Sequence, residues 1–357
     1  MNNSSKSFLP ALTGIRAIAA YLVFIYHFTP SPLVIGDTFH DFLHEMHIGV
    51  TMFFVLSGFI ITYKYYDNIL SIRKYFLNRF ARIFPMYFIL TCFTFLFLAI
   101  KSGHFYVSDL KEFLSCITFL KGFFPDLRLV GIGQGWTLTV EESFYLMAPL
   151  FFVLIKKSRL YLIIIPIVLI LIGFAVVHFI TIPSSFKFIN SDKFMLLFTF
   201  FGRCFEFFVG IWIAIFFKKN LIRFRFLTLF GVISILVFVY ILSTLKGGEE
   251  GIYHPLGIFV NNFVLPIIGI APLYLGLLYE KTLFKSFLSS PLMVLLGKSS
   301  YMFYLIHLGI LTNLLSEITS NYFVIFIILN FISVLLFKYL EEPLSLIVKT
   351  RLINFKK

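Results

Sequence analysis

The chain has 357 residues, of which 59% are hydrophobic, and its formal net charge is +13. Ordinary soluble domains are roughly 45–50% apolar, so this composition, with 50 phenylalanines, excludes a soluble globular protein and indicates a polytopic membrane protein. The positive charge would suggest nucleic acid in a soluble protein, but membrane proteins gather Lys and Arg in cytoplasmic loops. We expect no nucleic-acid partner. Cys92, Cys116 and Cys204 lack ligand or disulfide spacing, so no metal is expected.

Apolar segments long enough to cross a membrane recur along the chain, since a spanning helix needs about 20 mostly apolar residues. Ten candidates are 11–28, 48–66, 84–101, 137–155, 160–179, 195–217, 226–244, 256–279, 290–315 and 322–340. The segment 112–124 is apolar but short, and it predicts an interfacial or re-entrant piece.

The distribution of basic residues predicts the orientation. With the N-terminus in the cytoplasm, the segments on the cytoplasmic side carry far more Lys and Arg than those on the outer side. We therefore expect an all-α helical bundle of about ten transmembrane helices with both termini cytoplasmic. It should form a single integral-membrane domain, 1–357, without an appended soluble domain.

The first apolar segment contains two ionisable residues, Arg16 toward the cytoplasmic end and His27 toward the outer end. Eleven residues correspond to about three helical turns and about 16 Å, so both side chains lie on one face. Ionisable residues within a membrane usually face a cavity or a partner. The pair indicates a functional site. The alternative is that both only cap the helix or extend to the membrane surface.

Two arginines mark the beginning of the third span. Arg79 and Arg82 are three residues apart and share a helix face. Two guanidinium groups on one face can bind a phosphate through paired hydrogen bonds, although anchoring to anionic lipid headgroups is an alternative. In the preceding span, Ser57 and Gly58 interrupt the apolar run, and close helix packing is their simplest interpretation.

Two glutamates lie near the outer end of the predicted span 137–155. Glu141 lies four residues before Tyr145 and shares its face. A carboxylate at this depth could orient a histidine or act as a base. The alternative, which suits Glu142 best, is that acids are favoured in the first turn of any helix.

Three further features lie toward the C-terminus. Arg203 and Glu206 are three apart within a span and predict a structural ion pair. His307 could line a cavity or simply bond to a neighbouring helix. Pro343 is expected to end the last helix.

Six ordered motifs cover nearly the whole chain and resemble the membrane-bound acyltransferase family 3, whose members O-acylate cell-surface sugars. They are R-x10-H at 16–27, GVTMFFVLSGF at 49–59, RxxR at 79–82, WTLTVEESFYLMAP at 136–149, RCFEFFVG at 203–210 and SYMFYLIH at 300–307. Each motif is weak alone, but the ordered set is typical of the family.

The resemblance implies an acyl-CoA donor, usually acetyl-CoA, in the cytoplasm and a sugar hydroxyl acceptor on the outer side. His27 matches the essential histidine of the family and Arg16 its basic partner. Arg79 and Arg82 match the pair implicated in holding the coenzyme, and Glu141 matches the glutamate of the tryptophan motif. Some members carry an extra soluble domain after the bundle; this chain is expected to work with the bundle alone or with a partner.

The resulting hypothesis is an O-acetyltransferase of a bacterial inner membrane, with catalytic residues His27, Glu141 and Arg16. Its acceptor would be a surface polysaccharide or lipid-linked sugar, above all lipopolysaccharide O-antigen, including sialic-acid-like residues. Weaker candidates for the substrate cavity are Trp136, Glu142, Tyr145, Ser57, Tyr301 and His307. The competing hypothesis is a transporter or flippase of a lipid-linked sugar or small solute, although the sequence shows no clear repeat or broken helix of the kind transporters carry.

Overall fold

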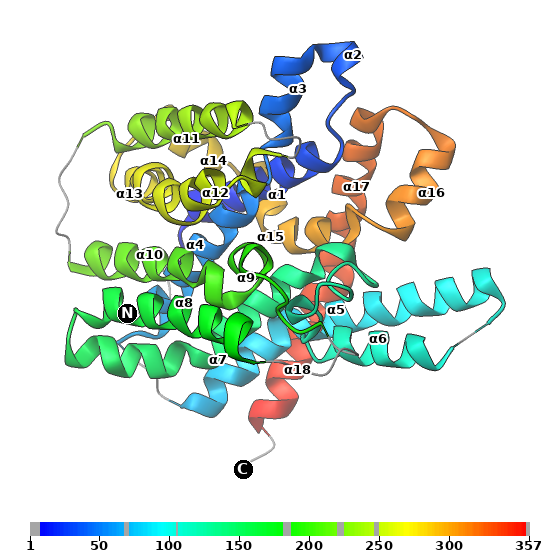
Figure 1. The fold of residues 1–357 in the computed structure, drawn as a ribbon, viewed down its shortest axis with the longest axis horizontal. Helices are drawn as coiled ribbons and strands as arrows, with labels where there is room; N and C mark the ends of the chain where they lie inside the picture. The colour runs from blue at the N-terminus through cyan, green and yellow to red at the C-terminus, as the bar shows by residue number, and fades with distance from the viewer. Residues whose placement is uncertain are drawn as a thin grey trace. The chain divides into compact units, whose positions relative to one another are not determined.

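A computed structural model describes residues 8–67, 71–104, 106–180, 187–219, 225–245 and 250–354. These residues form α-helices with short 3-10 and π turns, and they contain no strand (Figure 1). The chain divides into two compact units, residues Met1–Asn68 with Arg203–Ser300 and residues Ile69–Gly202 with Tyr301–Lys357.

Nine helical stretches in the described residues are long and apolar enough to cross a membrane, and the bent pair Pro291–Ile306 and Ile310–Ile318 would make a tenth. The expected polytopic helical fold is confirmed, while the cytoplasmic placement of both termini stays a prediction. The predicted span 290–315 is broken, because its two helices meet at 86° next to Gly309, which has a φ of 106°. The expectation of unbroken helices was therefore wrong at this point.

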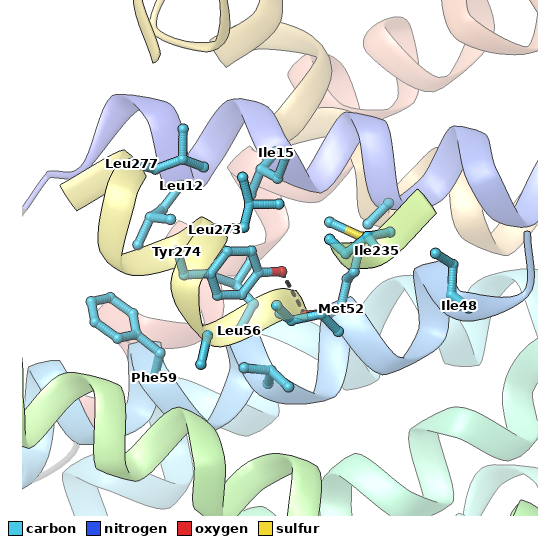
Figure 2. Close-up of a cluster of buried hydrophobic side chains, with 14 of the residues drawn as sticks. Leu12, Ile15, Ile48, Met52, Leu56, Phe59, Ile235, Leu273, Tyr274 and Leu277 are labelled. Carbon is cyan, nitrogen blue, oxygen red and sulfur yellow. Dashed lines mark hydrogen bonds between the residues drawn. The ribbon is translucent and has the colours of Figure 1, made fainter. Parts of the chain in front are cut away.

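The first unit is built on buried helix-to-helix contacts. Its elements are α1 (Pro10–His27), α2 (Pro32–Ile35), α3 (Asp37–His44), α4 (Ile48–Tyr65), most of α10 (Phe200–Lys219), α11 (Leu227–Thr244), η4 (Gly251–Tyr253), α12 (Pro255–Phe259), η5 (Val260–Val264), η6 (Pro266–Ile270), α13 (Ala271–Tyr279), α14 (Leu283–Leu288) and most of α15 (Pro291–Ile306). Figure 2 shows side chains of α1, α4, α11 and α13 meeting in its core, where the Tyr274 hydroxyl donates to the Met52 carbonyl over 2.8 Å.

Glycines allow α4 and α10 to approach closely. A Cβ at Gly58 would overlap the Phe207 carbonyl oxygen, and one at Gly210 would overlap the Val55 carbonyl oxygen. Small residues permit this kind of contact between membrane helices. The structure therefore supports the packing interpretation of the Ser57–Gly58 break, and Ser57 itself is half-buried beside this contact.

The second unit holds the longest helix. Its elements are α5 (Ile72–Ser102), α6 (Val107–Ile117), η2 (Lys121–Phe123), η3 (Gly133–Gly135), α7 (Trp136–Lys157), α8 (Tyr161–Phe179), α9 (Asp192–Phe198), α16 (Ile310–Ile318), α17 (Tyr322–Leu336), η7 (Phe337–Glu341) and α18 (Glu342–Asn354). Helices α5 and α6 lie side by side, as do α7 and α8 (Figure 1). With 11 residues, α6 is about 16 Å long, which is too short to span a bilayer.

Two helix boundaries differ from the sequence prediction. Helix α5 begins at Ile72 rather than near residue 84, so Arg79 and Arg82 lie inside it. Pro343 does not end the last helix, which continues as α18. The π turn η7 shifts the hydrogen-bond pattern just before this proline, so that Glu342 N–H bonds to the Phe337 carbonyl. Pro343 then occupies an early position of the next helical segment, where a missing N–H costs little.

Candidate functional site

His27 is the last residue of α1 and its side chain is exposed. Arg16, eleven residues earlier on the same helix face, is half-buried and interacts electrostatically with Tyr274. The helix therefore presents a titratable base at an accessible end and a permanent cation deeper in the first unit.

A polar cluster surrounds the C-terminal end of α1. The ring of Tyr26 lies 4.6 Å from that of His27, 5.2 Å from that of His44 and 5.7 Å from that of His47. The Tyr26 hydroxyl donates to Glu250 Oε2 over 3.0 Å, and His44 Nδ1 lies 3.8 Å from Glu250 Oε1. We call Tyr26, His44, Glu45, His47 and Glu250 the outer cluster, after the side of the membrane that the sequence predicts for this end of α1. Sequence reasoning missed it.

Glu45 is the most buried member of the outer cluster. Its Oε1 accepts the N–H of Gly251 over 2.6 Å. Gly251 has no room for a side chain, because a Cβ there would overlap the Leu242 carbonyl oxygen and crowd Glu45 itself. A signal was present in DTFHDFLHEMH, residues 37–47, which concentrates histidines and acids between two spans.

Arg203 and Glu206 form a buried ion pair in α10, 2% and 0% exposed. Arg203 donates from Nε and from a terminal nitrogen to the two Glu206 oxygens over 2.8 and 2.6 Å. The same terminal nitrogen reaches Thr51 Oγ1 over 2.9 Å, and Thr51 donates to Asn261 in the π turn η5. The pair thus links α10 to α4 and η5.

The arginine pair lies in the second unit. Arg82 is paired with the buried carboxylate of Glu341, and its guanidinium lies 5.9 Å from the ring centre of Tyr301. The Arg79 guanidinium lies 5.8 Å from the ring centre of Tyr145. Cation–π contacts of this length are attractive. The arginines therefore stand among aromatic rings and one carboxylate inside the unit.

The two glutamates of α7 lie deeper in their helix than expected. The helix begins at Trp136, its first turn contains no acid, and Glu141 and Glu142 fall in the second turn. Favourable placement in the first turn therefore does not explain them. Both are half-buried, and Glu142 interacts electrostatically with Arg79. Glu141 and His27 belong to different units, and their predicted pairing stays a prediction.

The break between α15 and α16 has its own polar caps. His307 is fully buried, and its Nδ1 lies 2.8 Å from the Tyr304 carbonyl oxygen of its own helix. Gln134 donates to the carbonyls of Tyr304 and Leu305 over 2.7 and 2.9 Å. Thr312 donates to the Ile306 and His307 carbonyls. These bonds satisfy carbonyls that the end of a helix leaves unpaired.

Lys121 has a structural role that the sequence did not reveal. It is 0% exposed, and its Nζ donates to the carbonyls of Val130 and Ile132 over 2.7 and 2.5 Å. The ammonium group therefore fixes the loop that leads into α7. Burial lowers the pKa of Lys121 to about 8.

This pKa predicts a dependence of stability on pH. The unfolded chain, with a lysine pKa of about 10.4, binds more protons than the folded one between pH 8 and that value, so stability rises with pH there. The shift corresponds to about 3 kcal/mol. Lys121→Met removes this titration. The unfolding free energy of the wild type relative to Lys121→Met should therefore increase from pH 7 to 10.5, and a difference independent of pH would contradict the burial of a charged Lys121.

Within the described ranges, no group of three or more His, Cys, Asp and Glu side chains could hold a metal ion. In the first unit the structure places Arg16 and His27 on one helix. In the second it brings Arg79 and Arg82 together with Tyr145, Tyr301 and Glu341. The Trp136 ring lies 5.0 Å from that of Phe198.

Comparisons with known proteins agree with the sequence motifs. A family model described as an acyltransferase domain matches residues 9–339. The O-acetyltransferase OatA of Staphylococcus aureus (strain NCTC 8325) is 26% identical over 329 residues, which cover 86% of this chain and 51% of that protein. The acyltransferase MdmB of Streptomyces mycarofaciens is 30% identical over 165 residues, 42% of this chain and 40% of that protein. The chain spans about half the length of OatA. No solved structure matches it.

Proposed function

Because this chain belongs to acyltransferase family 3, we propose that it is a membrane O-acetyltransferase that moves an acetyl group from cytoplasmic acetyl-CoA to a sugar hydroxyl. The acceptor is a cell-surface polysaccharide or its lipid-linked precursor at the outer side of a bacterial inner membrane, with lipopolysaccharide O-antigen as the first candidate. The observation that carries this proposal is an accessible histidine, His27, within a polar cluster at the end of a membrane-spanning helix.

The chemistry needs a base because a sugar hydroxyl is a poor nucleophile. His27 accepts the proton of the acceptor hydroxyl as that oxygen attacks the thioester carbonyl carbon. The new C–O bond forms, the C–S bond breaks, and the proton passes to the departing coenzyme A sulfur. A second route acetylates His27 first. Trapping a stable acetyl-enzyme with acetyl-CoA alone would favour this second route over direct transfer.

The donor is bound by the basic residues. Arg79 and Arg82 bind the phosphates of acetyl-CoA near the cytoplasmic end of α5. Arg16 lies along the path of the pantetheine arm or neutralises a phosphate at its mouth. The rise of about 16 Å between Arg16 and His27 lets a narrow arm carry the acetyl group toward the outer side while the nucleotide stays inside.

Replacing Arg82 by lysine tests its part in donor binding. Lysine keeps a positive charge opposite Glu341 but loses the planar fork that binds phosphate through two bonds. We expect the KM for acetyl-CoA to rise about 10- to 100-fold, since hydrogen bonds to charged groups contribute about 1.5–3 kcal/mol. Arg73→Lys, at an exposed position of the same helix, is the matched control. Equal KM values for the two variants would remove Arg82 from the donor site.

A transporter is the second candidate, and the broken span α15–α16 favours it, because discontinuous helices are common at transporter sites. Release of coenzyme A distinguishes the acetyltransferase, which produces it, from the transporter, which does not. Purified protein in proteoliposomes, supplied with acetyl-CoA and a membrane extract of acceptor glycans, should liberate free thiol. Movement of a lipid-linked sugar without thiol release would establish the transporter instead.

A further inference from the structure

Two buried side chains of the outer cluster leave hydrogen-bonding capacity unused. Glu45 is 2% exposed and His47 is 9% exposed. Within the described part of the chain, Oε2 of Glu45 and both ring nitrogens of His47 lack a well-directed hydrogen bond. Most buried polar atoms in folded proteins have a partner. The backbone of Ile252 acts on Glu45 and the backbone of His44 acts on His47, but a better-directed partner would stabilise both side chains.

The spacing of the two side chains suits a hydroxyl group. His47 Nδ1 lies 3.6 Å from Glu45 Oε2, which is too long for a direct hydrogen bond. One oxygen placed about 2.8 Å from both atoms would bond to each. A hydroxyl can donate to the carboxylate and accept from the imidazole N–H, whereas an ammonium group only donates and a carboxylate only accepts.

The cluster also reaches from the buried pair to the surface. The side chains of His44 and Glu250 are 35% and 22% exposed, and Tyr26 contacts both of them. The Tyr26 ring lies beside the rings of both His44 and His47 and adds an aromatic surface next to the polar atoms. Aromatic walls with a few placed polar groups are typical of small-molecule sites.

The charge of the cluster discriminates between ligands. Glu250 and Asp41 are acidic, and both act on Glu45 electrostatically. Arg203 acts on His47 from α10, but its guanidinium is already held by both oxygens of Glu206. An anionic ligand would meet like charges, which penalise the wrong partner.

We infer that the outer cluster is the acceptor subsite and that it selects an uncharged, hydroxyl-rich sugar over an acidic one. This inference rests on the proposed function, because His27 borders the cluster through Tyr26 and is the base that the acceptor must reach. Glu45 and His47 hold one sugar hydroxyl, and Glu250 repels carboxylated sugars. A neutral hexose residue therefore fits, and the sialic-acid-like acceptor considered from the sequence does not.

Two glycosides that differ only at C6 test the inference. The probes are methyl β-D-glucopyranoside and the corresponding methyl glucuronoside, and the readout is their stimulation of thiol release from acetyl-CoA by the full chain in proteoliposomes. We expect kcat/KM for the neutral glycoside to exceed that for the acidic one about 10- to 100-fold. Glu45→Gln should lower kcat/KM for the neutral glycoside about 10- to 100-fold, the range for losing a hydrogen bond to a charged group.

Charge removal should also change selectivity. Glu250→Gln, at a partly exposed position, should narrow the preference for the neutral glycoside about tenfold, an effect that a purely structural role would not produce. Asp37→Asn is the matched control, because it removes an exposed acid from α3, the helix that also carries His44. This variant should keep the wild-type preference for the neutral glycoside. If Glu45→Gln fails to fold, the ratio of the two kcat/KM values in Glu250→Gln still tests the subsite.

Three results would overturn the subsite. They are equal use of both glycosides by the wild type, the same preference in Glu250→Gln and Asp37→Asn, or no stimulation by either glycoside although the wild type consumes acetyl-CoA. The last result would assign the orphaned atoms of Glu45 and His47 to a buried water. A wild type that never consumes acetyl-CoA, with or without membrane extract, would refute the proposed function itself.

Discussion

His27→Ala should lower the turnover of acetyl transfer by about 10²–10⁴-fold, the usual contribution of a positioned base. Alanine has no group that could accept the hydroxyl proton, while the exposed end of α1 tolerates the loss of a side chain without a cavity. The measurement is kcat for thiol release from acetyl-CoA by purified protein with its acceptor extract. The KM for acetyl-CoA should change little, because His27 lies at the end of α1 away from Arg16.

The matched control is His104→Ala, which removes an exposed histidine from the second unit. It should retain wild-type turnover and show that the assay is insensitive to the loss of a surface imidazole. Full activity of His27→Ala would exclude both direct transfer and an acetyl-histidine intermediate.

Glu206→Ala should destabilise the protein by about 3–5 kcal/mol, because it leaves the guanidinium of Arg203 buried without its carboxylate. The expected effect is large since both residues are almost fully buried and their hydrogen bonds extend to Thr51 and Asn261. The measurement is the unfolding midpoint in detergent micelles, compared at equal protein and detergent concentrations.

The control for this prediction removes both charges. Arg203→Met with Glu206→Leu replaces the ion pair by apolar side chains of similar size, and such exchanges are often neutral or stabilising. The double variant should therefore unfold closer to the wild type than Glu206→Ala does. A single variant as stable as the wild type would show that Arg203 reaches water when its partner is removed.

Much of the fold could be predicted because a membrane demands long apolar helices. The span over 137–155, for example, became α7 (Trp136–Lys157) with ends that differ by one or two residues. The break in 290–315 could not be predicted, because the segment is long and apolar enough to form one span. Its two helices bend apart where Gln134 and Thr312 supply hydrogen bonds to carbonyls of the break, and Gln134 lies far away in sequence.

The residues of the site that share one helix could be predicted, but the residues that surround them from other parts of the chain could not. The spacing of Arg16 and His27 placed both on one face, and the spacing of Arg79 and Arg82 did the same. The outer cluster could not be predicted because 37–47 lies between two predicted spans, and because Glu45 meets Gly251 across 206 positions. Lys121 lies in the short apolar segment 112–124, whose sequence does not reveal that the side chain is buried and bonded to backbone carbonyls.

The most direct test of acetyl transfer by His27 measures alkali-labile acetate on the surface polysaccharide of cells that express the wild type or His27→Ala at matched membrane levels. We expect acetate on cells with the wild type and none above background on cells with His27→Ala. Equal acetate in both would remove His27 from the chemistry, and with it the assignment of the C-terminal end of α1 as the site of acetyl transfer.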